Sequence, residues 1–179
     1  IGDSTAGAMT VNGISSANST NITTVDLNSS SIAFSTGDST FKGLTATANT
    51  GAITGAVALS LAGTSSFTTS ASNQSITLSS TSNDFTGAVS FNTTGSSANT
   101  TLVTNSSIIL GASTIGGDHS VTVGGTSKIM TISGAQDVGG AITLQSSGDL
   151  TLTSLLSSTS SSDSAISLTS TGGGIFDGD

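Results

Sequence analysis

Residues 140–152 read GAITLQSSGDLTL, two short runs of alternating apolar and small polar residues on either side of a polar turn. Such alternation over three to five residues is typical of a β-strand with one buried face. Residues 55–59 and 87–91 share the pattern of the first run: a Gly, a small residue, and then two apolar residues separated by one position. Because Gly adopts positive φ at no steric cost, we expect these glycines to form tight corners before strands.

Similar apolar pairs recur along the chain, and no stretch of about 11 residues has the 3.6-residue period of a helix. One series recurs every ~20 residues and comprises Val89, Leu110, Met130 and Leu150. A second series recurs roughly every 19 to 24 residues and comprises Val57, Ile76, Leu102, Val121, Ile142 and Ile166. Two interleaved series with one period indicate two faces of a coil that stacks on itself. Residues 15–21 and 155–164 are polar, lack alternation and are predicted to be loops.

We therefore predict an all-β fold, a parallel β-helix (β-solenoid) of about 8–9 coils with roughly 20–22 residues in each coil. An antiparallel β-sandwich is the alternative, because it also places strands every ~8 to 12 residues, although it needs no shared period. Residues 1–179 are expected to be a single solenoid segment and part of a longer repetitive chain. Most of the six Phe side chains should lie in the core columns of this solenoid.

The charge balance excludes several classes of function. The ten acidic residues are all Asp, only two Lys and no Arg oppose them, and the net charge is −8. Nucleic-acid binding needs basic patches that neutralise phosphate, so no nucleic-acid partner is expected. Docking on anionic membranes is disfavoured for the same reason. No run of about 18 apolar residues exists, so no membrane insertion is expected.

The later repeats carry a family resemblance. Residues 83–91 (NDFTGAVSF), 108–117 (IILGASTIGG) and 121–125 (VTVGG), followed by the runs within 140–152, resemble the repeats of large bacterial exoproteins of the filamentous haemagglutinin type. The resemblance covers roughly Asn83 to Leu168. It implies a right-handed parallel β-helix, export across the outer membrane, and a role in adhesion, biofilm formation or cell–cell contact.

Few residues are candidates for a chemical site. Five Asp residues directly follow a Gly and are expected to cap nearby backbone N–H groups in turns: Asp3, Asp38, Asp118, Asp149 and Asp179. The only histidine, His119, follows Gly117 and Asp118 at an expected corner and is predicted to be a solvent-exposed turn residue. No partner for catalysis is implied by spacing. Thr-x-Thr pairs at 45–47 and 151–153 do not recur in every repeat, which disfavours ice binding.

Calcium is the metal for which the sequence offers a candidate. Asp177 and Asp179 follow three glycines and form a weak acidic, Gly-rich pattern, but the full calcium-binding nonapeptide repeat is absent. No cofactor is otherwise expected. Catalytic residues are not predicted, because the carboxylates are scattered and there is no Arg to hold an acidic sugar.

The sequence therefore favours a structural role over an enzymatic one. We expect an extracellular, cell-surface stalk that mediates attachment or cell–cell contact, with surface glycans or other cells as partners. The alternative is a self-assembling extracellular filament subunit that associates end to end through open strand edges. A carbohydrate-active β-helix enzyme is a less favoured third interpretation.

Overall fold

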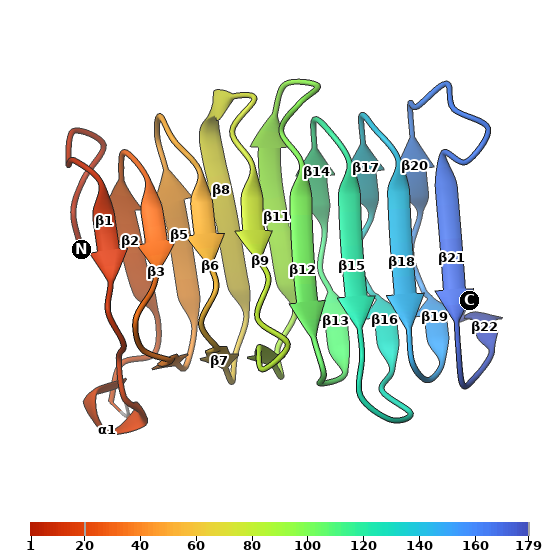
Figure 1. The fold of residues 1–179 in the computed structure, drawn as a ribbon, viewed down its shortest axis with the longest axis horizontal. Helices are drawn as coiled ribbons and strands as arrows, with labels where there is room; N and C mark the ends of the chain where they lie inside the picture. Colours follow the sequence, from red (N-terminus) through yellow and green to blue (C-terminus); the bar gives the residue numbers. More distant parts are fainter. Residues whose placement is uncertain (20, 179) are drawn as a thin grey trace.

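The structure is a computed structural model and describes residues 1–19 and 21–178. Every strand pairing in it is parallel, and the chain winds through about eight stacked turns (Figure 1). The chain runs down the near sheet and up the far strands as it advances from the N-terminal to the C-terminal end (Figure 1), which is a right-handed winding. The predicted parallel β-helix is thus confirmed, and the antiparallel sandwich is wrong.

Sheet A forms one continuous face of the solenoid and takes one strand from each turn. Its strands are, in order, β1 (Met9–Val11), β3 (Ile32–Phe34), β6 (Ile53–Gly55), β9 (Ile76–Leu78), β12 (Thr100–Thr104), β15 (His119–Val123), β18 (Ile142–Ser146) and β21 (Ile166–Ser170). The length of a turn varies along the stack. The turn from Thr100 to its register partner His119 is shorter than the predicted coil, and the turn from Ile76 to its partner Thr100 is longer.

The opposite side is built from two sheets. Sheet C contains β2 (Val25–Ser29), β5 (Leu44–Ala48), β8 (Ser65–Ser72), β11 (Val89–Thr94), β13 (Ile108–Leu110), β16 (Met130–Ile132), β19 (Leu150–Leu152) and β22 (Ile175–Asp177). It also includes β14 (Ser113–Ile115), β17 (Gln136–Val138) and β20 (Leu156–Ser158). The short sheet B contains β4 (Ser39–Phe41), β7 (Leu59–Leu61) and β10 (Asp84–Phe85). The cross-section therefore changes after the fourth turn, where the long strand β11 pairs with both β13 and β14.

Four steps of the predicted periodicity are wrong. In sheet A, Ile76 pairs with Thr100 rather than with Leu102, and Val121 pairs with Leu144 rather than with Ile142. Leu110 pairs with Ile132 rather than with Met130, although both series members lie in sheet C. Val57 lies just before β7, and the residue of its turn that stacks on Ile76 in sheet A is Ile53. The predicted loops also contain regular structure, since β20 lies within 155–164 and a short helix, α1 (Ser16–Ser19), lies within 15–21.

The core runs along the solenoid axis as columns of stacked apolar side chains. One column holds an Ile in most turns, and Ile53, Ile76 and Ile142 are fully buried within it. Five of the six Phe are buried as predicted, and three of them pack together: Phe67 stacks on Phe91 at 5.8 Å between ring centroids and meets Phe85 edge-on at 6.4 Å. Phe176 is the exception, at 50% exposed.

Carboxylate, amide and hydroxyl side chains link successive turns where strands begin. Asn99 Oδ1 accepts from the backbone N–H of Asp118, and Asp118 Oδ1 accepts from that of Ala141, both at 2.8 Å. Asp38 Oδ1 accepts in the same way from Ala58 N–H, and Asp149 Oδ1 from Gly174 N–H. The expected Asp caps therefore exist at these positions, but they bind the next turn rather than the local turn.

Candidate functional site

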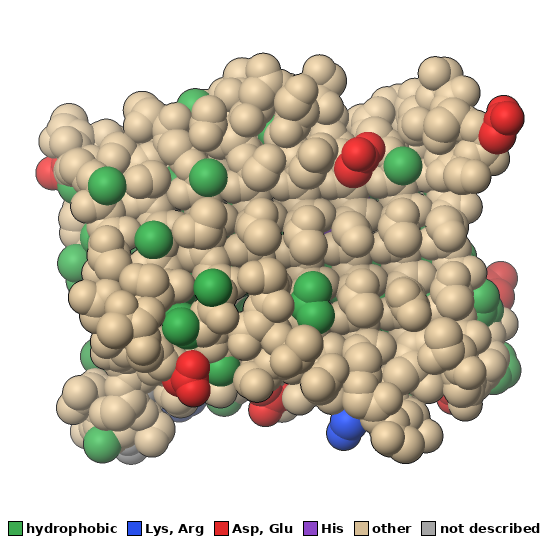
Figure 2. All heavy atoms as spheres, in the orientation of Figure 1, with side chains coloured by type: hydrophobic (Ala, Val, Ile, Leu, Met, Phe, Trp, Pro, Cys, Tyr) green, Lys and Arg blue, Asp and Glu red, His purple; other side chains and the backbone are tan. Residues whose placement is uncertain are grey.

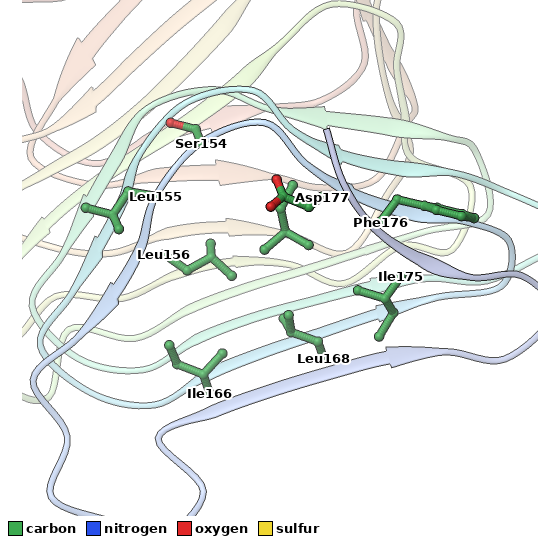
Figure 3. A pocket seen from close by; sticks show the side chains of 9 residues that line it. Ser154, Leu155, Leu156, Ile166, Leu168, Ile175, Phe176 and Asp177 are labelled. Carbon is green, nitrogen blue, oxygen red and sulfur yellow. The ribbon is translucent and has the colours of Figure 1, made fainter. Parts of the chain in front are cut away.

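A hollow lies at the C-terminal end of the solenoid (Figure 3). It has a volume of about 650 Å³ and is lined by Leu152, Ser154, Leu155, Leu156, Ile166, Leu168, Ile175, Phe176 and Asp177. We call this surface the C-terminal end face. The lining comes from β19, β20, β21, β22 and the segment before β20, so the hollow is the open end of the coil rather than a cleft in its side.

The apolar side chains of the end face continue the columns of the core. Ile166 is the register partner of the fully buried Ile142, and Ile175 is the partner of the fully buried Leu150. Ile166 and Ile175 themselves are 43% and 48% exposed. In the earlier turns the equivalent residues are buried beneath the next turn. The end face therefore carries the same apolar side chains as an internal interface between two turns.

The strand edges at this end are open as well. Among the described strands, β20 pairs only with β17, β21 only with β18, and β22 only with β19. Their outer edges present backbone N–H and C=O groups in the parallel arrangement that the other turns use. Open edges of this kind are templates for the addition of further strands. In this structure the end face therefore combines open backbone edges with an apolar hollow.

The calcium candidates give no formed site in the described part of the chain. Asp177 is exposed at the rim of the end face, and Asp179 lies outside the described residues. Within residues 1–19 and 21–178, no three His, Cys, Asp or Glu side chains come together as a possible metal-binding group. The same residues include no helix with the length and apolar character needed to cross a membrane.

His119 is buried, so the prediction of an exposed turn residue is wrong. It begins β15, points into the Ile column between Thr100 and Ile142, and is only 1% exposed. Its Nδ1 shares a hydrogen bond with Thr100 Oγ1, and its ring lies 5.9 Å from that of Phe91. Its Nε2 has no hydrogen-bond partner in the described structure. The alternation His119-x-Val121-x-Val123 was the sequence signal for an inward position.

Burial lowers the pKa of His119 from 6.5 to about 4, because the apolar core disfavours the imidazolium. The folded protein therefore holds His119 neutral at neutral pH, while the unfolded chain binds a proton below pH 6.5. The unfolded state then binds more protons, so stability falls as the pH drops from 6.5 toward 4.

We expect His119→Ile to remove this pH dependence, since Ile fills the same column in neighbouring turns. The free energy of unfolding of the wild type should fall by about 2 kcal/mol more than that of the variant between about pH 7 and 4.5. Urea unfolding of both proteins at each pH gives their free energies of unfolding. The difference between the two proteins removes the contribution of the Asp residues, which both contain. An identical pH dependence in the two proteins would contradict the buried, neutral state of His119.

Comparison with known proteins places the chain in a repeat family. The family described as "Repeats of unknown function (DUF5649)" matches residues 20–92 and 97–161. These two segments begin after α1, end after β20 and cover most of the stacked turns. Comparisons with curated proteins and with solved structures gave no match. Because the two matched segments make up more than half of the chain, the protein belongs to the DUF5649 family of repeats of unknown function.

Proposed function

We propose that this solenoid is a rigid spacer in the stalk of an extracellular bacterial surface protein that mediates attachment or cell–cell contact. The observation that carries the proposal is the uninterrupted parallel stacking of about eight turns around one apolar core. Parallel turns ~4.8 Å apart give a rod whose length grows with each repeat. A spacer needs length and stiffness more than it needs a catalytic group.

Three features support stiffness in this rod. Each internal strand of sheet A is hydrogen-bonded to a neighbour on both sides. The core beneath is closed, with Leu102, Val121 and Leu144 at most 1% exposed. Side-chain caps such as Asp118 Oδ1 to Ala141 N–H tie the corners of successive turns together. Bending would require these bonds and contacts to open at one side of the rod.

The resemblance of residues 83–168 to haemagglutinin-type repeats supports placement outside the cell and a role in adhesion. Surface glycans or other cells are the partners that this role implies. A carbohydrate-active enzyme receives less support, because Asp38, Asp118 and Asp149 serve as caps between turns. We propose no catalytic role and no resident cofactor.

The placement is tested on cells that produce the protein naturally. An antibody against the chain should label intact, unpermeabilised cells, and deletion of the repeat region should shorten the surface projections seen by electron microscopy and reduce attachment. Labelling that requires permeabilised cells would rule out the stalk. Labelling of intact cells with unchanged attachment after deletion would rule out the adhesive role.

A second candidate is a subunit of a self-assembling filament, in which the C-terminal end face of one copy would meet another copy. If this face joins copies, replacing Ile166 and Ile175 together by Lys should abolish association, because two charges would enter an apolar interface. Sedimentation velocity over a range of concentrations measures the association. The matched control is Ile109→Lys with Ile129→Lys, since these side chains are 37% and 43% exposed but lie away from the end. If both pairs of substitutions reduced association equally, the end face would not be the interface.

A further inference from the structure

The interface between the fourth turn (β9 to β11) and the fifth turn (β12 to β14) differs from its neighbours on the side of sheets B and C. We call this interface the joint. Strand β8 of the third turn pairs with β11 at each residue from Val89 to Asn92, and again at Thr94. The fifth turn meets β11 at two single residues, where Val89 pairs with Leu110 and Asn92 pairs with Thr114. The next interface is regular again, because β13 pairs with β16, and β14 with β17, over three residues each.

Sheet B ends at the joint. Among residues 21–178, β10 pairs with β7 of the third turn and with no strand of the fifth. A hollow of about 510 Å³ lies beside β10, and it is lined by residues 84–86 of the fourth turn, 106–109 of the fifth, and 128–129 and 131 of the sixth. The fifth turn therefore leaves the edge of sheet B open.

Side-chain hydroxyls take part in the hydrogen bonds that cross the joint on this side. The backbone N–H of Phe91 donates to Ser113 Oγ at 3.1 Å, and that hydroxyl donates to Gly111 O at 3.2 Å. The N–H of Gly116 likewise donates to Thr93 Oγ1 at 3.2 Å. Because a side-chain hydroxyl can change its rotamer, such a bond fixes the backbone less firmly than the bond to a carbonyl in a regular ladder.

Sheet A crosses the joint without a break. Strand β9 pairs with β12 over all three of its residues. Near the corner that follows β9, Asn83 Nδ2 donates to Val103 O of the fifth turn at 3.0 Å, and Asn83 Oδ1 accepts from Leu59 N–H of the third turn at 2.9 Å. Figure 2 shows the central band of the face over sheet A running across the middle of the molecule without a gap. One side of the joint is therefore held more firmly than the other.

The family match divides the chain at the same place. Its two segments, residues 20–92 and 97–161, are separated by residues 93–96. Residues 93–94 end β11, the last strand of the fourth turn, and the fifth turn begins with β12 at Thr100. The boundary between the two matched repeat segments therefore lies at the joint, and this observation is independent of the contacts described above.

We propose that the joint is a hinge, at which the solenoid bends by opening on the side of sheets B and C while sheet A stays paired. The turns before and after the joint then move as two rigid blocks. The use of this hinge in a stalk rests on the spacer role proposed above, because a hinged spacer can yield to a sideways load without unfolding its turns. The hinge itself is a property of the chain and is tested on the purified protein.

Hydrogen exchange of individual backbone amides in the full chain tests the hinge. The N–H groups of Phe91, Gly111 and Gly116 bind across the joint on its open side. The N–H of Ile76 binds across the joint in sheet A, and that of Ser65 binds across the preceding interface. After correction for intrinsic rates, the three amides of the open side should exchange at least about 10-fold faster than the other two, because local opening exposes them without unfolding either block.

A disulfide across the joint provides a matched pair of variants, since the chain contains no Cys. Asn92→Cys with Thr114→Cys links two register partners across the joint, and Thr47→Cys with Thr68→Cys does the same between the second and third turns. Neighbouring strands lie ~4.8 Å apart, which is within the Cα–Cα range of disulfides. Oxidation of the first pair should slow the amides of the open side to the rate of Ser65, whereas oxidation of the second pair should leave them fast.

Three results would overturn the hinge. The first is exchange on the open side as slow as that of Ser65. The second is equally fast exchange of Ile76, which would mean that the two turns separate completely instead of bending. The third is fast exchange that persists after the disulfide across the joint has formed. Circular dichroism of the reduced variants checks the fold. Failure of the stalk proposal on cells would not change these rates, and uniformly slow exchange would remove the hinge but leave a straight spacer.

Discussion

Phe67→Ala should destabilise the protein by about 3 to 5 kcal/mol, the usual cost of removing a fully buried Phe side chain. Phe67 is 0% exposed and contacts two further rings, those of Phe85 and Phe91. Its ring lies in the third turn, whereas Phe85 and Phe91 belong to the fourth. The substitution thus leaves a cavity between two turns near the middle of the stack, where no chain end can relax to fill it.

The consequence should extend beyond the free energy. In a solenoid each turn contacts only its neighbours, so a weak interface in the middle divides one cooperative unit into two. Urea unfolding of Phe67→Ala should show an earlier and broader transition than the wild type. The control is Phe176→Ala, in which the ring removed is half exposed at the C-terminal end face. Equal effects of the two substitutions would contradict a continuous core through these turns.

The sequence predicted the parallel fold because many strands alternate apolar and small polar residues. The pairs Ile142/Leu144 and Leu150/Leu152 directed their side chains inward, and a shared period favoured a coil over a sandwich. The register was harder to predict. The turns differ in length, so the partner of Leu110 cannot be obtained by adding a fixed period, and Met130 was assigned where the structure has Ile132.

The candidate sites were less predictable than the fold. His119 was interpreted from its neighbours Gly117 and Asp118 as part of a corner, while its own position two residues before Val121 makes it an inward strand residue. The register of sheet A depends on seven strand pairs, and an error of one residue in any pair moves a side chain to the opposite face. The residues of the end face could not be predicted either, because no local sequence pattern shows which strands form the last turn.

The glycines show how a correct position can have a wrong explanation. Gly87 and Gly140 precede strands as predicted, whereas Gly55 is the last residue of β6, and none of the three has a positive φ. Close approach between turns requires Gly87 and Gly140 instead. A Cβ on Gly87 would lie 2.3 Å from the carbonyl carbon of Gly63, and a Cβ on Gly140 would lie 2.2 Å from Asp118 Oδ1. Backbone contact between turns, rather than a left-handed corner, excludes side chains there.

Gly87→Val should therefore destabilise the protein by at least ~3 kcal/mol, near the upper end of overpacking effects. The new side chain meets the backbone of Gly63 and Thr64, which cannot rotate away as a flexible side chain could. The third and fourth turns would have to separate at this corner, and the backbone hydrogen bond from Ser65 N to Ala88 O, next to the site, would lengthen or break.

Urea unfolding again provides the measurement, and Gly7→Val is the control. A Cβ on Gly7 would have no heavy atom within 4 Å, and its backbone has no positive φ. Both variants replace Gly by Val and so lose similar backbone freedom. A difference between them therefore reports the space around each glycine. We expect the midpoint of Gly7→Val to stay near that of the wild type and that of Gly87→Val to fall sharply. Equal midpoints for the two variants would mean that turns three and four do not touch at Gly87, which contradicts the stacking on which the spacer proposal depends.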